Sequence, residues 1–263
     1  APAASAPVAR ASAAVKLPSP SAVVEAPPAA EATAANEAAA APLAIELPVY
    51  ATRLPAEGRW RYTLARGLAS GPALLAWLPQ ADGRYELRLE GAIAGVSVLD
   101  WVSRGALDGA GLAPERFAVR RRGRDHQAAN FQRDALPQRV TFSGPTHELP
   151  LLPGVQDRLS WLIQLPAVIE AAPQRHGAPG ARITLMVVGA RGGAELWRFE
   201  VIGAERVDDT PALRLLREAR RPRETQVEIW LDPARGHLPL RARLTTLEGG
   251  PALEFTYQGS TGP

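Results

Sequence analysis

Apolar and polar residues alternate with a period of two along most of the chain after residue 58. Between residues 59 and 64, for example, Trp60, Tyr62 and Leu64 alternate with arginines and a threonine. The same alternation recurs in seven further segments: 84–90, 116–120, 140–142, 197–201, 226–231, 238–244 and 253–257. Strict alternation is typical of antiparallel strands that bury one face and expose the other to water.

Short glycine-containing turns separate these segments, as at 81–83, 122–124 and 191–193. Turn residues between alternating segments predict hairpins. The pattern therefore predicts an all-β, mainly antiparallel fold. We expect a curved, partly closed sheet of roughly ten to twelve strands.

One segment, about 156–172, breaks the alternation and indicates a helix. Leu159, Leu162 and Ile163 recur at helical spacing, and Trp161 belongs to a second apolar stripe. A helix that is apolar on most sides is buried. A proline inside the segment is expected to kink the helix. We predict one internal kinked helix that lies in the concavity of the sheet.

The first 48 residues differ in composition from the rest. They contain 20 alanines and 8 prolines, but no glycine and no aromatic residue. Such a segment cannot bury enough apolar surface to offset the entropy lost on ordering. We therefore expect a disordered Ala/Pro-rich linker over 1–48 and a single antiparallel β domain over 49–263. The linker is expected to act as a spacer, and a tail without this role is the alternative.

Cysteine is absent from the chain, which excludes disulfides and thiol catalysis. The four histidines are spaced unlike any metal-binding motif, and we expect them to be solvated: His126, His147, His176 and His237. The sequence suggests no metal, no cofactor and no catalytic residue. An Asp/His site assembled from distant strands remains one alternative, with an enzyme acting on envelope glycan or lipid.

The net charge of +3 is modest, although two short runs, 120–124 and 217–223, are rich in arginine. We interpret both runs as solvated faces, with contact to anionic lipid as an alternative. Aromatic residues do not interleave with the arginines, so a base-stacking platform is missing. We therefore expect no nucleic-acid partner.

Four of the six tryptophans are expected to face inward, where large aromatic side chains either fill a core or line an apolar cavity. Our hypothesis is an apolar cavity between the helix and the sheet. Its expected lining is Trp60, Trp101, Leu159, Trp161, Leu162, Ile163 and Trp197.

Four stretches in this order resemble the bacterial domain-of-unknown-function family 3108: Arg84–Gly91, Ser103–Phe117, Pro153–Ser160 and Trp230–Arg241. The resemblance implies an exported envelope protein of Gram-negative bacteria, and it implies no known reaction. The expected location is the periplasm, with anchoring to the inner membrane by a removed N-terminal segment. The predicted architecture is also similar to LolA/LolB-type lipoprotein carriers, which is an analogy of fold only.

Two non-enzymatic functions follow from these features. The first is the binding of an apolar or amphiphilic envelope ligand, such as a lipid or acyl chain, in the cavity. The second is a structural or adaptor role in an envelope complex, in which the core is solid and a surface recruits an envelope protein.

Overall fold

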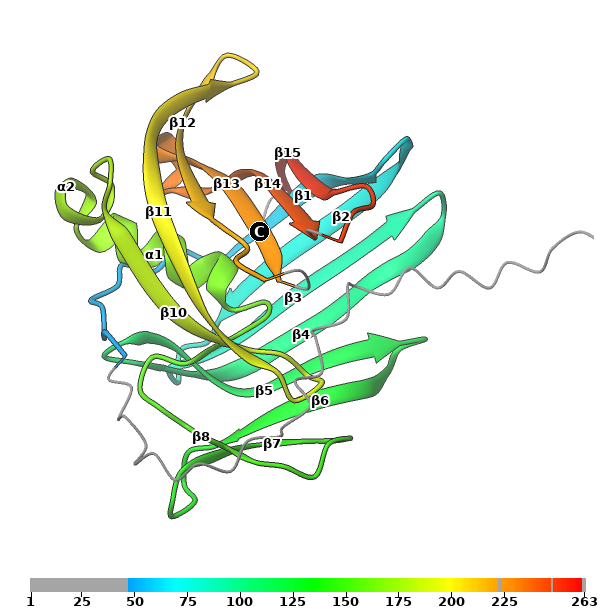
Figure 1. The fold of residues 1–263 in the computed structure, drawn as a ribbon, viewed down its shortest axis with the longest axis vertical. Coiled ribbons are helices and arrows are strands. Elements are labelled where there is room, and N and C mark those ends of the chain that lie inside the picture. The colour runs from blue at the N-terminus through cyan, green and yellow to red at the C-terminus, as the bar shows by residue number, and fades with distance from the viewer. Residues whose placement is uncertain (1–46, 222–223, 247, 262–263) are drawn as a thin grey trace, which may run out of the picture.

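The computed structural model describes residues 47–221, 224–246 and 248–261. The linker predicted over 1–48 therefore lies almost wholly outside the described residues. Within them, fifteen strands form one sheet (Figure 1). The strands are β1 (Gly58–Arg66), β2 (Ala69–Pro79), β3 (Arg84–Ile93), β4 (Val96–Asp108), β5 (Gly111–Arg121), β6 (Arg124–Gln132), β7 (Arg139–Phe142), β8 (Leu149–Pro150), β9 (Gln156–Asp157), β10 (Arg182–Val188), β11 (Ala194–Val207), β12 (Thr210–Arg217), β13 (Thr225–Asp232), β14 (Leu238–Thr246) and β15 (Leu253–Thr261).

Strands that follow each other in the chain are neighbours in the sheet, except β8 and β9, which form its two opposite edges. The order is β8-β7-β6-β5-β4-β3-β2-β1-β15-β14-β13-β12-β11-β10-β9, so the first and last strands pair in its middle. All pairs are antiparallel except β9 with β10, which is parallel. The sheet curves around helix α1 (Trp161–Ala171) without closing into a barrel (Figure 1). The all-β fold with an internal helix, predicted from the alternation, is confirmed.

The strand count and the helix bounds differ from the prediction. The count exceeds ten to twelve partly because β8 and β9 have two residues each, too few to show alternation. The helix was expected from residue 156, but residues 156–157 form β9 and α1 begins at Trp161. Pro166 lies inside α1, and Pro173 starts the short helix α2 (Pro173–His176). A 3-10 turn spans Pro233–Arg235.

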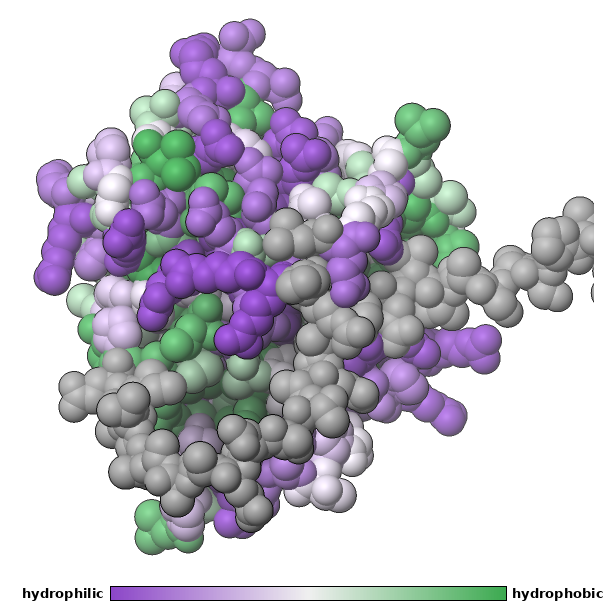
Figure 2. Space-filling model, viewed as in Figure 1, coloured by the Kyte–Doolittle hydropathy of each residue, from purple (hydrophilic) through white to green (hydrophobic). Residues whose placement is uncertain are grey.

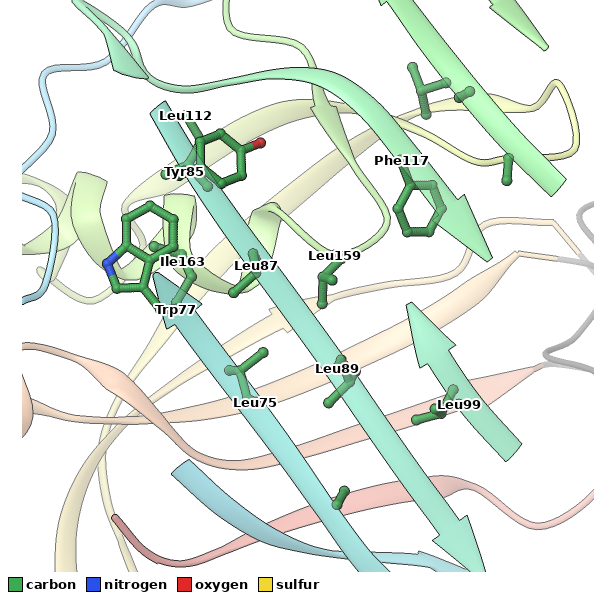
Figure 3. Close-up of a cluster of buried hydrophobic side chains, with 14 of the residues drawn as sticks. Leu75, Trp77, Tyr85, Leu87, Leu89, Leu99, Leu112, Phe117, Leu159 and Ile163 are labelled. Carbon is green, nitrogen blue, oxygen red and sulfur yellow. The ribbon is translucent and has the colours of Figure 1, made fainter. Parts of the chain in front are cut away.

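Two large clusters of buried side chains fill the concave side. The first joins β1–β5 to the start of α1, where Leu159 and Ile163 lie among Trp77, Tyr85 and other side chains of the sheet (Figure 3). The second packs the rest of α1 against β10–β14, with Trp161 next to Trp197. Helix α1 is therefore buried on most sides, as its sequence predicts. No helix in the described ranges is long and apolar enough to cross a membrane.

Candidate functional site

Two side chains, Asp157 and Ser160, close the turn that precedes α1. Oδ1 of Asp157 accepts hydrogen bonds from the backbone N–H groups of Leu159 and Ser160, both at 2.7 Å. The Ser160 hydroxyl accepts a bond from the Asp157 backbone N–H at 2.8 Å. Side chains that satisfy backbone donors locally favour a turn over a continued helix. This explains why the helix begins later than its apolar pattern suggests.

The Asp157 carboxyl also joins this turn to the middle of the sheet. Its Oδ2 accepts a hydrogen bond from the Ser103 hydroxyl on β4 at 2.5 Å, and that hydroxyl lies 3.0 Å from the Tyr85 hydroxyl on β3. Asp157, Ser103 and Ser160 are fully buried, and burial raises the pKa of Asp157 to about 6. Because no substrate reaches groups this deeply buried, we interpret them as a structural clamp, hereafter the Asp157 clamp.

Two buried glutamines, Gln164 of α1 and Gln156 of β9, bind backbone groups at the turn between β4 and β5. Gln164 accepts a hydrogen bond from the Leu112 backbone N–H at 2.9 Å and donates one to the Ala110 carbonyl at 2.6 Å. Gln156 donates to the Leu112 carbonyl at 2.9 Å. These bonds satisfy backbone groups that the helix would otherwise leave buried and unpaired. Gln164 therefore ties α1 to this turn, and Gln156 ties the strand before the helix to it.

Four apolar side chains of α1 and the sheet are only partly buried on the concave face. Leu162 of α1 and Phe255 of β15 each pack against both core clusters, and neither is fully buried. Trp101 on β4 and Val119 on β5 face each other across the β4–β5 pair and are also partly exposed. Figure 2 shows hydrophobic residues in the hollow of this face beside hydrophilic ones. We call Leu162, Phe255, Trp101 and Val119 the apolar seam.

A charged cluster adjoins this region at the start of α1. Glu195 binds Arg158 at 2.6 Å through Oε1 and Arg217 at 2.9 Å through Oε2. Both guanidinium groups lie over the Trp197 ring, at 5.2 Å and 4.7 Å from its centroid. The Arg217 residue is only 3% exposed, and burial lowers the pKa of its guanidinium. Two arginines share one carboxylate, and we call Arg158, Arg217 and Glu195 the arginine cluster.

A pocket of about 360 Å³ lies near the other end of α1. Its apolar wall includes Trp60, Leu54 and Leu238, and Arg53 and Arg235 also line it. Glu170 of α1 lines it too, and its carboxylate lies 2.7 Å from Nδ1 of His237. The volume is within the range of small-ligand sites, but this pocket is not the expected cavity between helix and sheet.

The seven residues predicted to line a cavity fall into three environments. Leu159, Ile163, Trp161 and Trp197 lie inside the packed clusters. Leu162 and Trp101 belong to the apolar seam. Trp60 lines the pocket at the far end of α1.

Sequence reasoning missed Glu195 and Arg217, and it misplaced one histidine. Arg217 was expected to be solvated, but it ends β12 on the concave side and is buried over Trp197. His237 was expected to be solvated, but it is 8% exposed and contacts Glu170. The described part of the chain contains no group of three or more His, Asp or Glu side chains that could hold a metal ion.

Comparison with known proteins gives a family and a fold. The family described as "Protein of unknown function (DUF3108)" matches residues 62–256. The beta-barrel-like protein of domain of unknown function DUF1849 from Brucella abortus is 13% identical, with a TM-score of 0.52 over 80% of this chain and 99% of that one. This likeness shows a shared fold and no more.

Two further solved structures are more distant. The MucA/MucB complex of Pseudomonas aeruginosa is 16% identical, with a TM-score of 0.31 over 78% of this chain and 51% of that one. The Mycobacterium tuberculosis lipoprotein LppX is 7% identical, with a TM-score of 0.29 over 79% and 88%. No curated protein matches the chain.

Proposed function

We propose that this chain, which belongs to the DUF3108 family of proteins of unknown function, binds an amphiphile with an anionic head group on the concave face of its sheet. The observation that carries the proposal is that Leu162 and Phe255 of the apolar seam contact both packed clusters and yet stay partly exposed, while Arg158 lies in the turn just before the helix that carries Leu162. The proposed location is the periplasmic side of the inner membrane, as the family resemblance implies.

The apolar seam suits the hydrocarbon part of such a ligand. Leu162 and Phe255 contact both core clusters, so a chain that covers them extends the core instead of forming a separate patch. Each methylene that leaves water on binding contributes about 0.8 kcal/mol. An acyl chain therefore gains affinity over the seam without any rearrangement of the packed helix.

The arginine cluster suits the head group. Arg158 lies in the turn that directly precedes α1, and Leu162 is the second residue of that helix. Glu195 pairs with both guanidinium groups, and Glu224 is a second carboxylate near Arg217. A phosphate or carboxylate next to Arg158 would add charge-assisted hydrogen bonds to a guanidinium that shares its carboxylate with Arg217.

A glutamate at the seam is expected to reduce ligand retention strongly. The full chain, purified from bacterial membranes, is expected to carry a stoichiometric acyl lipid in native mass spectrometry. Leu162→Glu places a charge under the hydrocarbon chain and is expected to lower occupancy about ten-fold or more. Leu136→Glu is the matched control, because Leu136 is 95% exposed and lies outside the seam.

The result that would overturn this proposal is a wild-type chain that carries no lipid and takes none up from a membrane lipid extract. Equal occupancy in the two folded glutamate variants would also contradict it. A solid-core adaptor would then be the better hypothesis, and crosslinking in cells would follow.

Arg158→Gln is expected to reduce head-group selectivity while leaving hydrocarbon binding intact. The affinity for lysophosphatidylglycerol, measured by titration calorimetry, is expected to fall about ten-fold, the loss of one charge-assisted hydrogen bond. The affinity for lysophosphatidylcholine is expected to change little. Arg53→Gln serves as the control because Arg53 is exposed and lines the other pocket. A parallel loss for both lipids would show that Arg158 supports the fold and not the head group.

A further inference from the structure

Alternate hairpin turns of this sheet lie at opposite ends of its strands, because consecutive strands are antiparallel. The turns β1–β2, β3–β4 and β5–β6 lie at one end, and they project on the same side of the molecule in Figure 1. The loops β12–β13 and β14–β15 belong to this end as well. We call it the hairpin end. The turns β2–β3, β4–β5, β6–β7 and β11–β12 lie at the opposite end of their strands.

Exposed arginines gather at two places on the hairpin end. Arg121, Arg122 and Arg124 lie at the β5–β6 turn with one exposed carboxylate, that of Asp125. Arg220 and Arg221 lie in the β12–β13 loop, where the carboxylate of Glu224 is close to both. The opposite end mixes both signs of charge, so the β5–β6 turn is the local concentration of positive charge in a chain whose net charge is only +3.

The β5–β6 turn is the most basic part of the hairpin end. Arg122 and Gly123 have φ angles of 51° and 75°, which is the geometry of a tight hairpin turn with projecting side chains. Neighbouring Arg120 donates to the Gly123 carbonyl at 2.6 Å and thereby braces the turn. Within the described ranges, the side chains of Arg122 and Arg124 have no carboxylate partner. Their charge is available to an external anion.

The two neighbouring turns carry exposed apolar residues instead. Leu68 in the β1–β2 turn is 107% exposed, and Val96 after the β3–β4 turn is 61% exposed. A hydrogen bond of 3.1 Å from the Ala94 N–H to the Ser70 carbonyl holds the two turns together. Figure 2 shows hydrophobic and hydrophilic tips projecting on the side where Figure 1 places these hairpins. Leu68 and Val96 therefore give the two adjacent tips exposed apolar surface.

We propose that the hairpin end docks on the surface of an anionic lipid bilayer. Leu68 and Val96 enter the boundary between head groups and acyl chains, and Arg122 and Arg124 contact lipid phosphates. Apolar tips beside basic tips fit such a surface because it offers hydrocarbon and negative charge within a few ångströms. A nucleic acid offers phosphates but nothing for Leu68 and Val96, and the tips present no aromatic residue for base stacking.

This interaction is separate from the proposed amphiphile site, since the hairpin tips share no residue with the apolar seam or the arginine cluster. The test is flotation of the full chain with vesicles. Strong binding is expected to phosphatidylglycerol mixed with phosphatidylethanolamine, and little to phosphatidylcholine alone. Binding is expected to weaken with added salt, because exposed charges are screened.

Two double variants separate the two parts of the surface. Arg122→Asn with Arg124→Gln is expected to lower the partition coefficient about twenty-five-fold, about five-fold for each arginine near an anionic surface. Leu68→Ser with Val96→Ser is expected to lower it about ten-fold or more and to leave the salt dependence unchanged. Leu136→Ser with Arg53→Gln is the matched control from outside the hairpin end and is expected to bind like wild type.

Three results would overturn the proposal: no flotation with anionic vesicles, an equal loss in the control variant, or displacement from vesicles by equimolar duplex DNA. Displacement by DNA would mean that the hairpin end binds nucleic-acid phosphates and not a lipid surface. Lipid retention by the arginine double variant, measured by native mass spectrometry, distinguishes failure of docking from failure of the amphiphile site.

Discussion

Replacing Asp157 by alanine is expected to lower the free energy of unfolding by about 3–4 kcal/mol. The carboxyl accepts hydrogen bonds from two backbone N–H groups and from the Ser103 hydroxyl, and all of these donors are buried. Each buried donor that loses its acceptor costs about 1–3 kcal/mol, and the loss is partly offset because a buried carboxylate is itself unfavourable. Urea unfolding followed by tryptophan fluorescence measures the difference.

Asp157→Asn is expected to behave differently, because asparagine can reverse the direction of the hydrogen-bond chain. Its Oδ1 keeps the two backbone donors, and its Nδ2 donates to the Ser103 hydroxyl, which then donates to Tyr85. The asparagine variant is therefore expected to be at least as stable as wild type at about pH 7, where Asp157 is ionised. An asparagine variant as unstable as the alanine variant would contradict the Asp157 clamp.

The same group makes stability depend on pH in a defined direction. Burial raises the pKa of Asp157 from 3.8 to about 6, so between these values the folded chain holds a proton that the unfolded chain has lost. Stability from this group is therefore complete below about pH 4 and is lost as the pH rises to about 6. The free energy of unfolding of wild type relative to Asp157→Asn is expected to fall by about 3 kcal/mol across this window. A constant difference would mean that Asp157 does not titrate there.

Local pattern was sufficient for much of the fold and not for the Asp157 clamp. Alternation at Trp60, Tyr62 and Leu64 revealed β1 because one face of that strand is wet. Strand β2 could not be predicted from alternation because both of its faces are largely apolar. The adjacent residues Ala76 and Trp77, for example, are both buried. Trp77 is therefore missing from the tryptophans expected to face inward, although it is fully buried.

The clamp could not be predicted because its partners are distant in the sequence. Ser103 is 54 residues before Asp157, and nothing in either local sequence indicates that they meet. The stretch Pro153–Ser160 belongs to the family resemblance, but only the folded sheet shows that its Asp157 binds Ser103 of β4. Arg217 is a similar case. Its arginine-rich run predicts a solvated side chain, but in the folded sheet its guanidinium lies over the Trp197 ring.

Glu195→Leu is expected to lower the free energy of unfolding by about 3 kcal/mol or more. The substitution leaves the Arg217 guanidinium, from a residue 3% exposed, without its carboxylate, and it removes the acceptor of the Trp197 N–H. Breaking a buried ion pair from one side typically costs about 3–5 kcal/mol. Glu200→Leu is the matched control on the same strand, because its ion pair with Arg182 is exposed; this variant is expected to stay close to wild type.

The double variant Glu195→Leu/Arg217→Leu separates stability from binding at this cluster. Removing both partners replaces a buried ion pair with apolar side chains, so more than half of the lost stability is expected to return. If Arg217 serves the fold and Arg158 contacts the head group, the recovered protein keeps its preference for lysophosphatidylglycerol over lysophosphatidylcholine, because the double variant retains Arg158 and removes only its carboxylate partner. A stable double variant that has lost this preference would contradict the assignment of the head-group contact to Arg158.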